Sequence, residues 1–247
     1  MKKVFLAILA AIAVMAMVSC NKDDQNKGGK KGGKTAVEVN VKIDGDVSEW
    51  KDVAVAAELD EDTVDAGRDS LLTLKLAADS QNLYVYYEFI VPDNAYVPVD
   101  VFINSDGDAA TGFSAWLWSE IGWEYLIESE DGCLENKTTV RNMDDATIYK
   151  AKTWKNAAGE QIGGWDTKEG AEQEALETKG FCTSAGKVAN GIGFVEMAIE
   201  RSAINARAKG KISVGIEVHC GGWQDNGILP QISTGSELAA AVEFMLP

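Results

Sequence analysis

The chain has 247 residues, of which 39 are acidic and 23 are basic, giving a formal net charge of −16 at pH 7. This balance excludes nucleic acid as an expected partner, because phosphate binding requires a clustered surface of Lys and Arg. The chain has one histidine and lacks any Cys-x-x-Cys pair, which argues against a zinc site of the Cys and His type.

The N-terminus has the form of an export signal. An apolar run over residues 5–18 follows two lysines and ends in the sequence Met-Val-Ser-Cys at Cys20. A spanning helix needs about 20 apolar residues, so this shorter run predicts a signal peptide over residues 1–19. The segment resembles the lipobox of bacterial lipoproteins, which implies a diacylglycerol on the Cys20 thiol and a further acyl chain, palmitate, on its amine. An uncleaved anchor helix is the alternative, and both interpretations put the body outside the cytoplasm.

Residues 20–35 are expected to form a flexible tether, because the stretch 26–34 contains no apolar residue that could pack. Loss of residues 1–19 removes two lysines, so the mature charge becomes 39 − 21, or 18 negative. Lys22-Asp23-Asp24 resembles the acidic signal that sends some lipoproteins to the outer face of the outer membrane. We therefore expect an outer membrane, cell-surface location, with an ordinary solvated linker as the other interpretation of these three residues.

Residues 36–247 predict one all-β domain. Val37, Val39, Val41 and Ile43 alternate with polar residues, which is the period of a half-buried strand. Similar runs recur at 71–76, 83–90, 97–103, 123–127, 192–199, 212–218 and 239–246.

Helical signals are few in this domain. A turn is expected over 47–52, and a second over 202–207 with Ser202 as its N-cap. Residues 141–190 are polar and rich in glycine, so we expect a loop region with short strands at best. These elements predict an antiparallel β-sandwich that is jelly-roll-like.

Six short motifs follow one another in this domain: I-D-G-x-x-x-E-W at 43–50, D-x-x-N-L-Y at 79–84, a strand with an acidic turn at 99–112, and segments at 123–127, 193–199 and 223–230. In this order they resemble family 9 carbohydrate-binding modules and the wider DOMON-like sandwiches. The resemblance implies a non-catalytic domain that captures poly- or oligosaccharide at the cell surface for separate enzymes or importers. The chain departs from the family at Asn104, where an Asp is expected.

Core residues are expected within these motifs. Gly45 permits a turn with positive φ, and Trp50 is expected to pack under the sandwich. Tyr84 and Tyr86 share one face of their strand and Tyr87 lies on the other, so packing explains these tyrosines more simply than stacking on a ligand.

A sugar site needs flat apolar faces beside groups that exchange hydrogen bonds with hydroxyls. The tryptophans set among Gly and polar residues are the candidates, and core packing is the alternative for each. The expected carbohydrate-binding residues are Trp116, Trp118, Trp123, Trp223, Asp225 and Asn226.

Three oxygen-bearing residues, Asn104, Asp106 and Asp108, alternate in a loop that contains glycine. Such ligands suit a structural calcium ion, although the spacing of an EF-hand is missing and a hairpin turn without metal is the alternative. No other cofactor is expected.

The sequence gives little support for an enzyme. Cys133, Cys182 and Cys220 allow at most one internal disulfide, and three free buried thiols are equally open. His219 has no nucleophile signature nearby, so we expect a satisfied core or edge histidine.

A structural or protein-interaction lipoprotein of a surface assembly, without sugar binding, is the alternative function.

Overall fold

The computed structural model describes residues 41–60, 69–114, 118, 121–155, 161–164, 174–176, 180–206, 209–220, 227–231 and 242–247. The expected signal peptide, Cys20 and the expected tether lie outside these residues. No helix in the described part of the chain has the length and apolar character that a membrane crossing requires.

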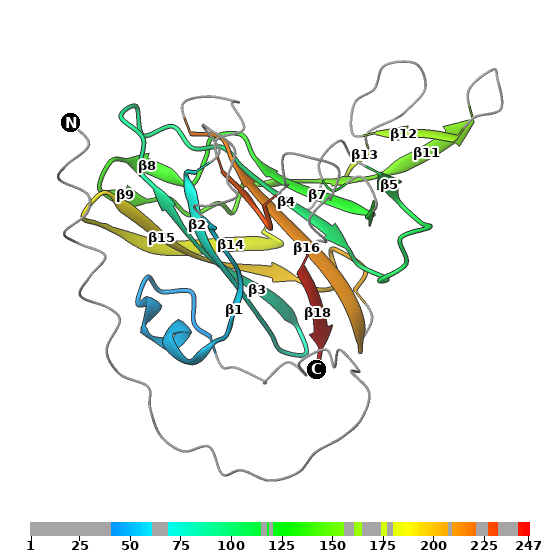
Figure 1. Cartoon of the computed structure of the whole chain (residues 1–247), viewed down its shortest axis with the longest axis horizontal. Coiled ribbons are helices and arrows are strands. Elements are labelled where there is room, and N and C mark those ends of the chain that lie inside the picture. The colour runs from blue at the N-terminus through cyan, green and yellow to red at the C-terminus, as the bar shows by residue number, and fades with distance from the viewer. Residues whose placement is uncertain are drawn as a thin grey trace, which may run out of the picture. The chain divides into compact units, whose positions relative to one another are not determined.

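Five antiparallel strands form the first sheet, in the order β1-β2-β3-β15-β14 (Figure 1). Their bounds are β1 Val55–Glu58, β2 Leu71–Ala78, β3 Asn82–Ile90, β14 Cys182–Ala189 and β15 Ile192–Glu200. The expected strands at 71–76, 83–90 and 192–199 are thus confirmed as β2, β3 and β15.

The second sheet has seven strands, in the order β13-β10-β7-β4-β16-β17, with β18 also paired to β16. Their bounds are β4 Val99–Asn104, β7 Tyr125–Ser129, β10 Thr147–Lys150, β13 Glu174–Leu176, β16 Gly210–Val218, β17 Gly227–Leu229 and β18 Val242–Leu246. The C-terminal run therefore closes this sheet, as its alternating pattern predicts.

Three two-stranded sheets accompany the main pair. They are β5 Phe113–Ser114 with β6 Gly122–Trp123, β8 Leu134–Asn136 with β9 Thr139–Val140, and β11 Lys152–Lys155 with β12 Gln161–Gly164.

The inner faces of the two main sheets share one buried apolar cluster. Val85 and Tyr87 of β3 and Val101 and Ile103 of β4 are completely buried in it. Burial of such side chains is the main favourable term in folding, so this cluster holds the layers together. The structure is therefore an all-β antiparallel sandwich, as the sequence predicts.

The outer face of the five-stranded sheet carries the I-D-G-x-x-x-E-W motif. The Trp50 indole stacks on Tyr86, with ring centroids 5.2 Å apart, and its Nε1 donates to Glu196 Oε2 at 3.1 Å. Glu196 Oε1 accepts from the backbone N–H groups of Asp44 at 2.8 Å and Gly45 at 2.6 Å. Gly45 has a φ of +85°, so both the expected turn and the expected burial of Trp50 are confirmed.

The expected turn at 47–52 is a 3₁₀ helix, Val47–Asp52, capped by Asp46, whose side chain accepts from Ser48 N. Ser202 begins no helix, because the backbone N–H of Ala206 bonds to the carbonyl of Arg201 in a turn. The expected turn is therefore confirmed over residues 202–205, and the expected N-cap role of Ser202 is wrong.

Two strand expectations also fail. Residues 41–43 form no strand, because Val41 packs with Trp50 in a small cluster instead of joining a ladder. The segment 141–190, expected to hold only short strands, contains the eight-residue strand β14. This strand pairs with β15 along its whole length, from Cys182 opposite Ile199 to Ala189 opposite Ile192.

Candidate functional site

The outer face of the seven-stranded sheet carries a second set of buried side chains. Strand β4 alternates between its two faces: Val101 and Ile103 point into the main core, and Asp100, Phe102 and Asn104 point outward. All six residues of β4 are buried, so this outer face is itself covered by other parts of the chain.

Aromatic rings cover the middle of this outer face. Phe102, Trp118 and Trp123 contact one another in pairs, with ring centroids 5.6 to 5.8 Å apart. The Trp118 indole Nε1 donates to the backbone carbonyl of Pro230 at 2.9 Å. This bond ties the segment around Trp118 to the chain directly after β17.

Gly215 of β16 lies directly under the Trp118 ring. A Cβ atom at this position would lie 2.8 Å from Cη2 and Cζ3 of Trp118, closer than van der Waals contact allows. The lack of a side chain at residue 215 therefore lets the indole rest on the strand.

The expectation that Trp118 and Trp123 stack on a sugar is wrong. Both side chains are 0% exposed, and each ring packs against other aromatic rings. A buried ring has no free face for a pyranose. The other four expected sugar-binding residues, Trp116, Trp223, Asp225 and Asn226, lie outside the described residues.

Beside the aromatic rings, ionisable side chains form a row that we call the acid–histidine row: Glu128, Asp100, Glu217 and His219. Asp100 of β4 lies opposite Glu128 of β7 and opposite Glu217 of β16. His219 follows Glu217 by two residues, so both side chains lie on one side of the strand. Strand register thus brings together groups that are far apart in the sequence.

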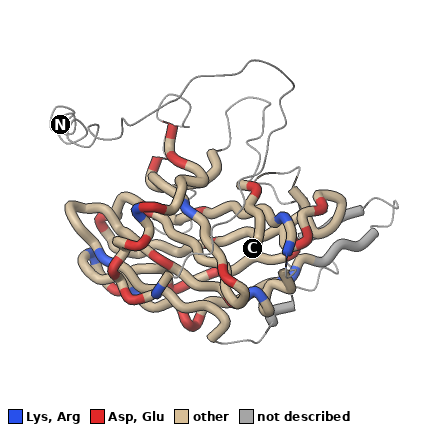
Figure 2. Tube along the Cα trace, turned by 90° about the horizontal axis from the view of Figure 1, so that it is seen from below, with Lys and Arg blue, Asp and Glu red and all other residues tan. Residues whose placement is uncertain are grey.

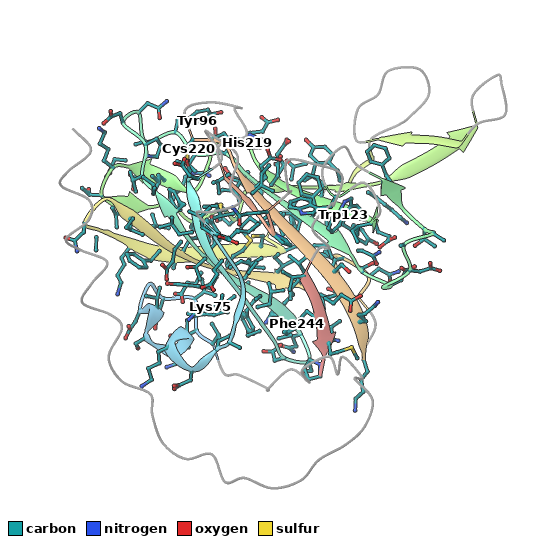
Figure 3. The ribbon with its side chains drawn as sticks, in the orientation of Figure 1. Lys75, Tyr96, Trp123, His219, Cys220 and Phe244 are labelled. Atoms are coloured by element: carbon teal, nitrogen blue, oxygen red, sulfur yellow. The ribbon has the colours of Figure 1, made fainter. Side chains whose placement is uncertain are left out.

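His219 lies at the end of β16, close to two carboxylates (Figure 3). Its Nε2 is 3.1 Å from Asp100 Oδ2, and its Nδ1 is 3.9 Å from Glu217 Oε1. Asp100, Glu217 and His219 are 7%, 0% and 5% exposed. The expected core position of His219 is confirmed, and the two acids beside it are ones that the sequence motifs did not mark.

Glu128 completes the row and is only half-buried. Its burial raises the pKa of the carboxyl to about 7, with further increases from the negative charges of Asp100 and Glu130. The hydroxyl of Tyr149, which donates to Glu128 Oε1 at 3.5 Å, and the nearby His219 lower the pKa in part. This end of the outer face therefore holds several acids close together.

No family model and no curated protein matches the chain. A solved structure, a carbohydrate binding module family 9 (CBM9) from Caldicellulosiruptor kristjanssonii in complex with cellotriose, is similar at a TM-score of 0.36 and 12% sequence identity, over 76% of each chain. At this low TM-score the similarity assigns neither a family nor a ligand to this chain.

The acidic turn forms at the other end of β4. Asn104 Oδ1 accepts from Gly107 N at 2.6 Å, and Asp106 Oδ1 accepts from Asp108 N at 2.8 Å. Asp108 Oδ1 accepts in turn from Ala110 N at 2.9 Å. These bonds account for the shape of the turn without a cation, and the calcium ion expected at Asn104, Asp106 and Asp108 stays a prediction.

The three internal cysteines are free. Burial raises the pKa of the Cys133 and Cys182 thiols to about 12 and that of Cys220 to about 11. A nucleophilic cysteine needs a lowered pKa, so these thiols stay protonated and have a packing role.

Asp100 and Glu217 are the site residues that the motifs missed. Each stands alone in an otherwise apolar run, between Val99 and Val101 or between Ile216 and Val218. A single acidic residue in a strand whose other residues are apolar indicates a buried polar cluster. The pairing of the two acids, however, depends on the register of β4 with β16.

Proposed function

We propose that this protein is a lipid-anchored, non-catalytic binder of poly- or oligosaccharide, with its binding surface at the β16–β17 side of the seven-stranded sheet. Cys20 would hold the chain on the outer membrane, and the tether would let the sandwich reach away from it. Bound sugar would then be concentrated for separate enzymes or importers.

One observation carries this proposal: the bond between Trp118 Nε1 and Pro230 O. Trp116 precedes Trp118 by two residues, and Trp223 precedes Gly227, the first residue of β17, by four. These separations along the chain are short, so the proposal puts both tryptophans beside that face. The two remaining candidates for sugar stacking would then flank the bond between Trp118 and Pro230.

Polar groups suited to sugar hydroxyls occur on the same face. Glu128 and Tyr149 are half-buried there, and Asp225 and Asn226 directly follow the segment of Trp223. Carboxylates and hydroxyls beside aromatic faces are the usual composition of a sugar site. The protonated thiols of the three internal cysteines agree with a non-catalytic role.

The charge distribution also agrees with this choice of ligand. In Figure 2, Lys and Arg are scattered among more numerous Asp and Glu along the described trace. A neutral glycan carries no charge that such a surface would repel, whereas a polyanion does.

A structural or protein-interaction lipoprotein without sugar binding is the second candidate. The burial of Trp118 and Trp123 favours it, because two of the four tryptophans expected to form the platform are core residues.

A glycan array followed by calorimetric titration of the purified protein separates the two functions. We expect binding of at least one poly- or oligosaccharide, with affinity reduced at least tenfold by Trp223→Ala or Trp116→Ala. The matched control is Val55→Ala, which removes an exposed apolar side chain on the edge of the other sheet and should leave affinity unchanged.

Failure of the folded protein to bind any glycan of a broad panel would reject sugar binding and favour the interaction function. Equal binding by both tryptophan variants would instead reject this surface as the site.

A further inference from the structure

Three metal-binding side chains converge at the end of the outer face. Asp100, Glu217 and His219 each offer one ligand atom, and these atoms all lie within 4.8 Å of one another. Other candidate sites among the described residues are an open polar pocket lined by residues such as Gln81 and Arg201 and the self-bonded acidic turn at Asn104. Only the first group combines an imidazole with carboxylates in a buried setting.

The spacing of these atoms suits a small divalent ion. Zinc binds imidazole nitrogen and carboxylate oxygen at about 2.0 to 2.2 Å, so neighbouring ligand atoms around one ion are about 3 to 3.5 Å apart. His219 Nε2 and Asp100 Oδ2 are 3.1 Å apart, which is within this range. Glu217 Oε1 lies 3.9 Å from the other ring nitrogen, so binding of one ion by all three residues requires the imidazole or the Glu217 side chain to turn toward the same side.

The ligands are held by paired strands. Asp100 and Glu217 are opposite each other in the β4–β16 ladder. The backbone N–H of His219 donates to the carbonyl of Pro98 at 2.9 Å, which fixes the chain beyond the end of β16. A site made from such rigid elements needs little ordering when an ion binds.

The local charge also suits a cation. The carboxylates of Asp100 and Glu217 are both nine-tenths buried or more, and Glu128 lies across the ladder from Asp100. Burying several carboxylates together is costly unless they are paired or coordinate a metal. A divalent ion offsets two of these charges at once.

We propose that Asp100, Glu217 and His219 bind a divalent transition-metal ion of the zinc class. Mixed nitrogen and oxygen ligands suit zinc better than calcium, which prefers oxygen alone. One ring nitrogen of His219 binds the ion, and the other keeps its proton. Three protein ligands leave a further coordination position for water.

The purified protein, saturated with Zn²⁺ and then dialysed, tests this site by its metal content. We expect about one Zn²⁺ per chain, a loss of at least tenfold in affinity in Asp100→Asn and in His219→Gln, and a melting temperature that Zn²⁺ raises in the unchanged protein but not in these two variants. Glu243→Gln, which alters an exposed carboxylate on β18, is the matched control and should retain the ion.

Two outcomes would overturn the metal site: no Zn²⁺ retained by the unchanged protein, or full retention by both folded variants. If the variants do not fold, Co²⁺ decides the question in the unchanged protein, because a visible absorption band of a nitrogen-ligated site supports the proposal and its absence rejects it. Glycan binding is measured separately, so the two proposals can fail independently.

Discussion

At the residue scale, Glu196 shows how one buried carboxylate fixes a sequence motif. Both of its oxygens accept hydrogen bonds from N–H donors, on the indole of Trp50 and on the backbone of Asp44 and Gly45. Gln cannot replace it, because whichever way the amide turns, its NH₂ group faces a donor.

We therefore expect Glu196→Gln to reduce the free energy of unfolding by about 1–3 kcal/mol, measured by urea denaturation. Glu200→Gln, an exposed position on the same strand, should have no such effect. The loss should shrink in a Trp50→Phe background, where one donor is gone. Equal urea midpoints for Glu196→Gln and Glu200→Gln would contradict this role.

At the element scale, β16 is the strand on which most of the structure depends. It pairs with β4 on one side and with both β17 and β18 on the other. It also supports Trp118 through Gly215 and supplies Glu217 to the acid–histidine row.

Gly215→Ala tests this arrangement. The new methyl group would lie 2.8 Å from the Trp118 ring, so the indole must move off the strand. We expect a loss of about 1–3 kcal/mol in the free energy of unfolding, again from urea denaturation. The cost should fall when Trp118 is also replaced by Leu, and an unchanged stability in the single variant would refute the close packing.

Much of the fold follows from local patterns, and particular elements explain the exceptions. Strands β2, β3, β15 and β16 have alternating or continuous apolar runs, so periodicity alone predicts them. Strand β14 contains Ser184, Gly186 and Lys187 and shows no such pattern. It forms because it pairs with the next strand, β15, across the two-residue turn Asn190-Gly191, in which both residues have positive φ; this Asn-Gly pair was the local signal of a hairpin.

The residues of the candidate site were harder to predict from the sequence than the strands were. Trp118 stands among polar and glycine residues, and its burial depends on Pro230, 112 residues away. Asp100 and Glu217 become neighbours only through strand register. Local composition identified the aromatic residues but carried no information about these long-range contacts.

At the scale of the whole molecule, the proposed attachment to the membrane depends on one residue, Cys20. Two or more acyl chains hold a protein on a bilayer, whereas one chain binds only marginally. Cys20→Ser should therefore abolish incorporation of labelled palmitate and move the protein from the membrane fraction to the soluble fraction.

Cys220→Ser, at a half-buried internal thiol, is the control and should remain labelled and membrane-bound. Palmitate labelling that persists in Cys20→Ser would exclude this residue as the anchor. Protease treatment of intact cells should degrade the unchanged protein, because the sandwich is expected on the outer surface.

The short strands at the edges of the two main sheets limit aggregation. β1 has four residues, and β13 and β17 have three each. A long exposed edge invites pairing with the edge of another molecule, and short edges limit the number of hydrogen bonds that such pairing can form. The longer β14 carries Lys187, whose charge opposes the same reaction. If the chain is anchored as proposed, copies crowded on one surface would thus stay separate.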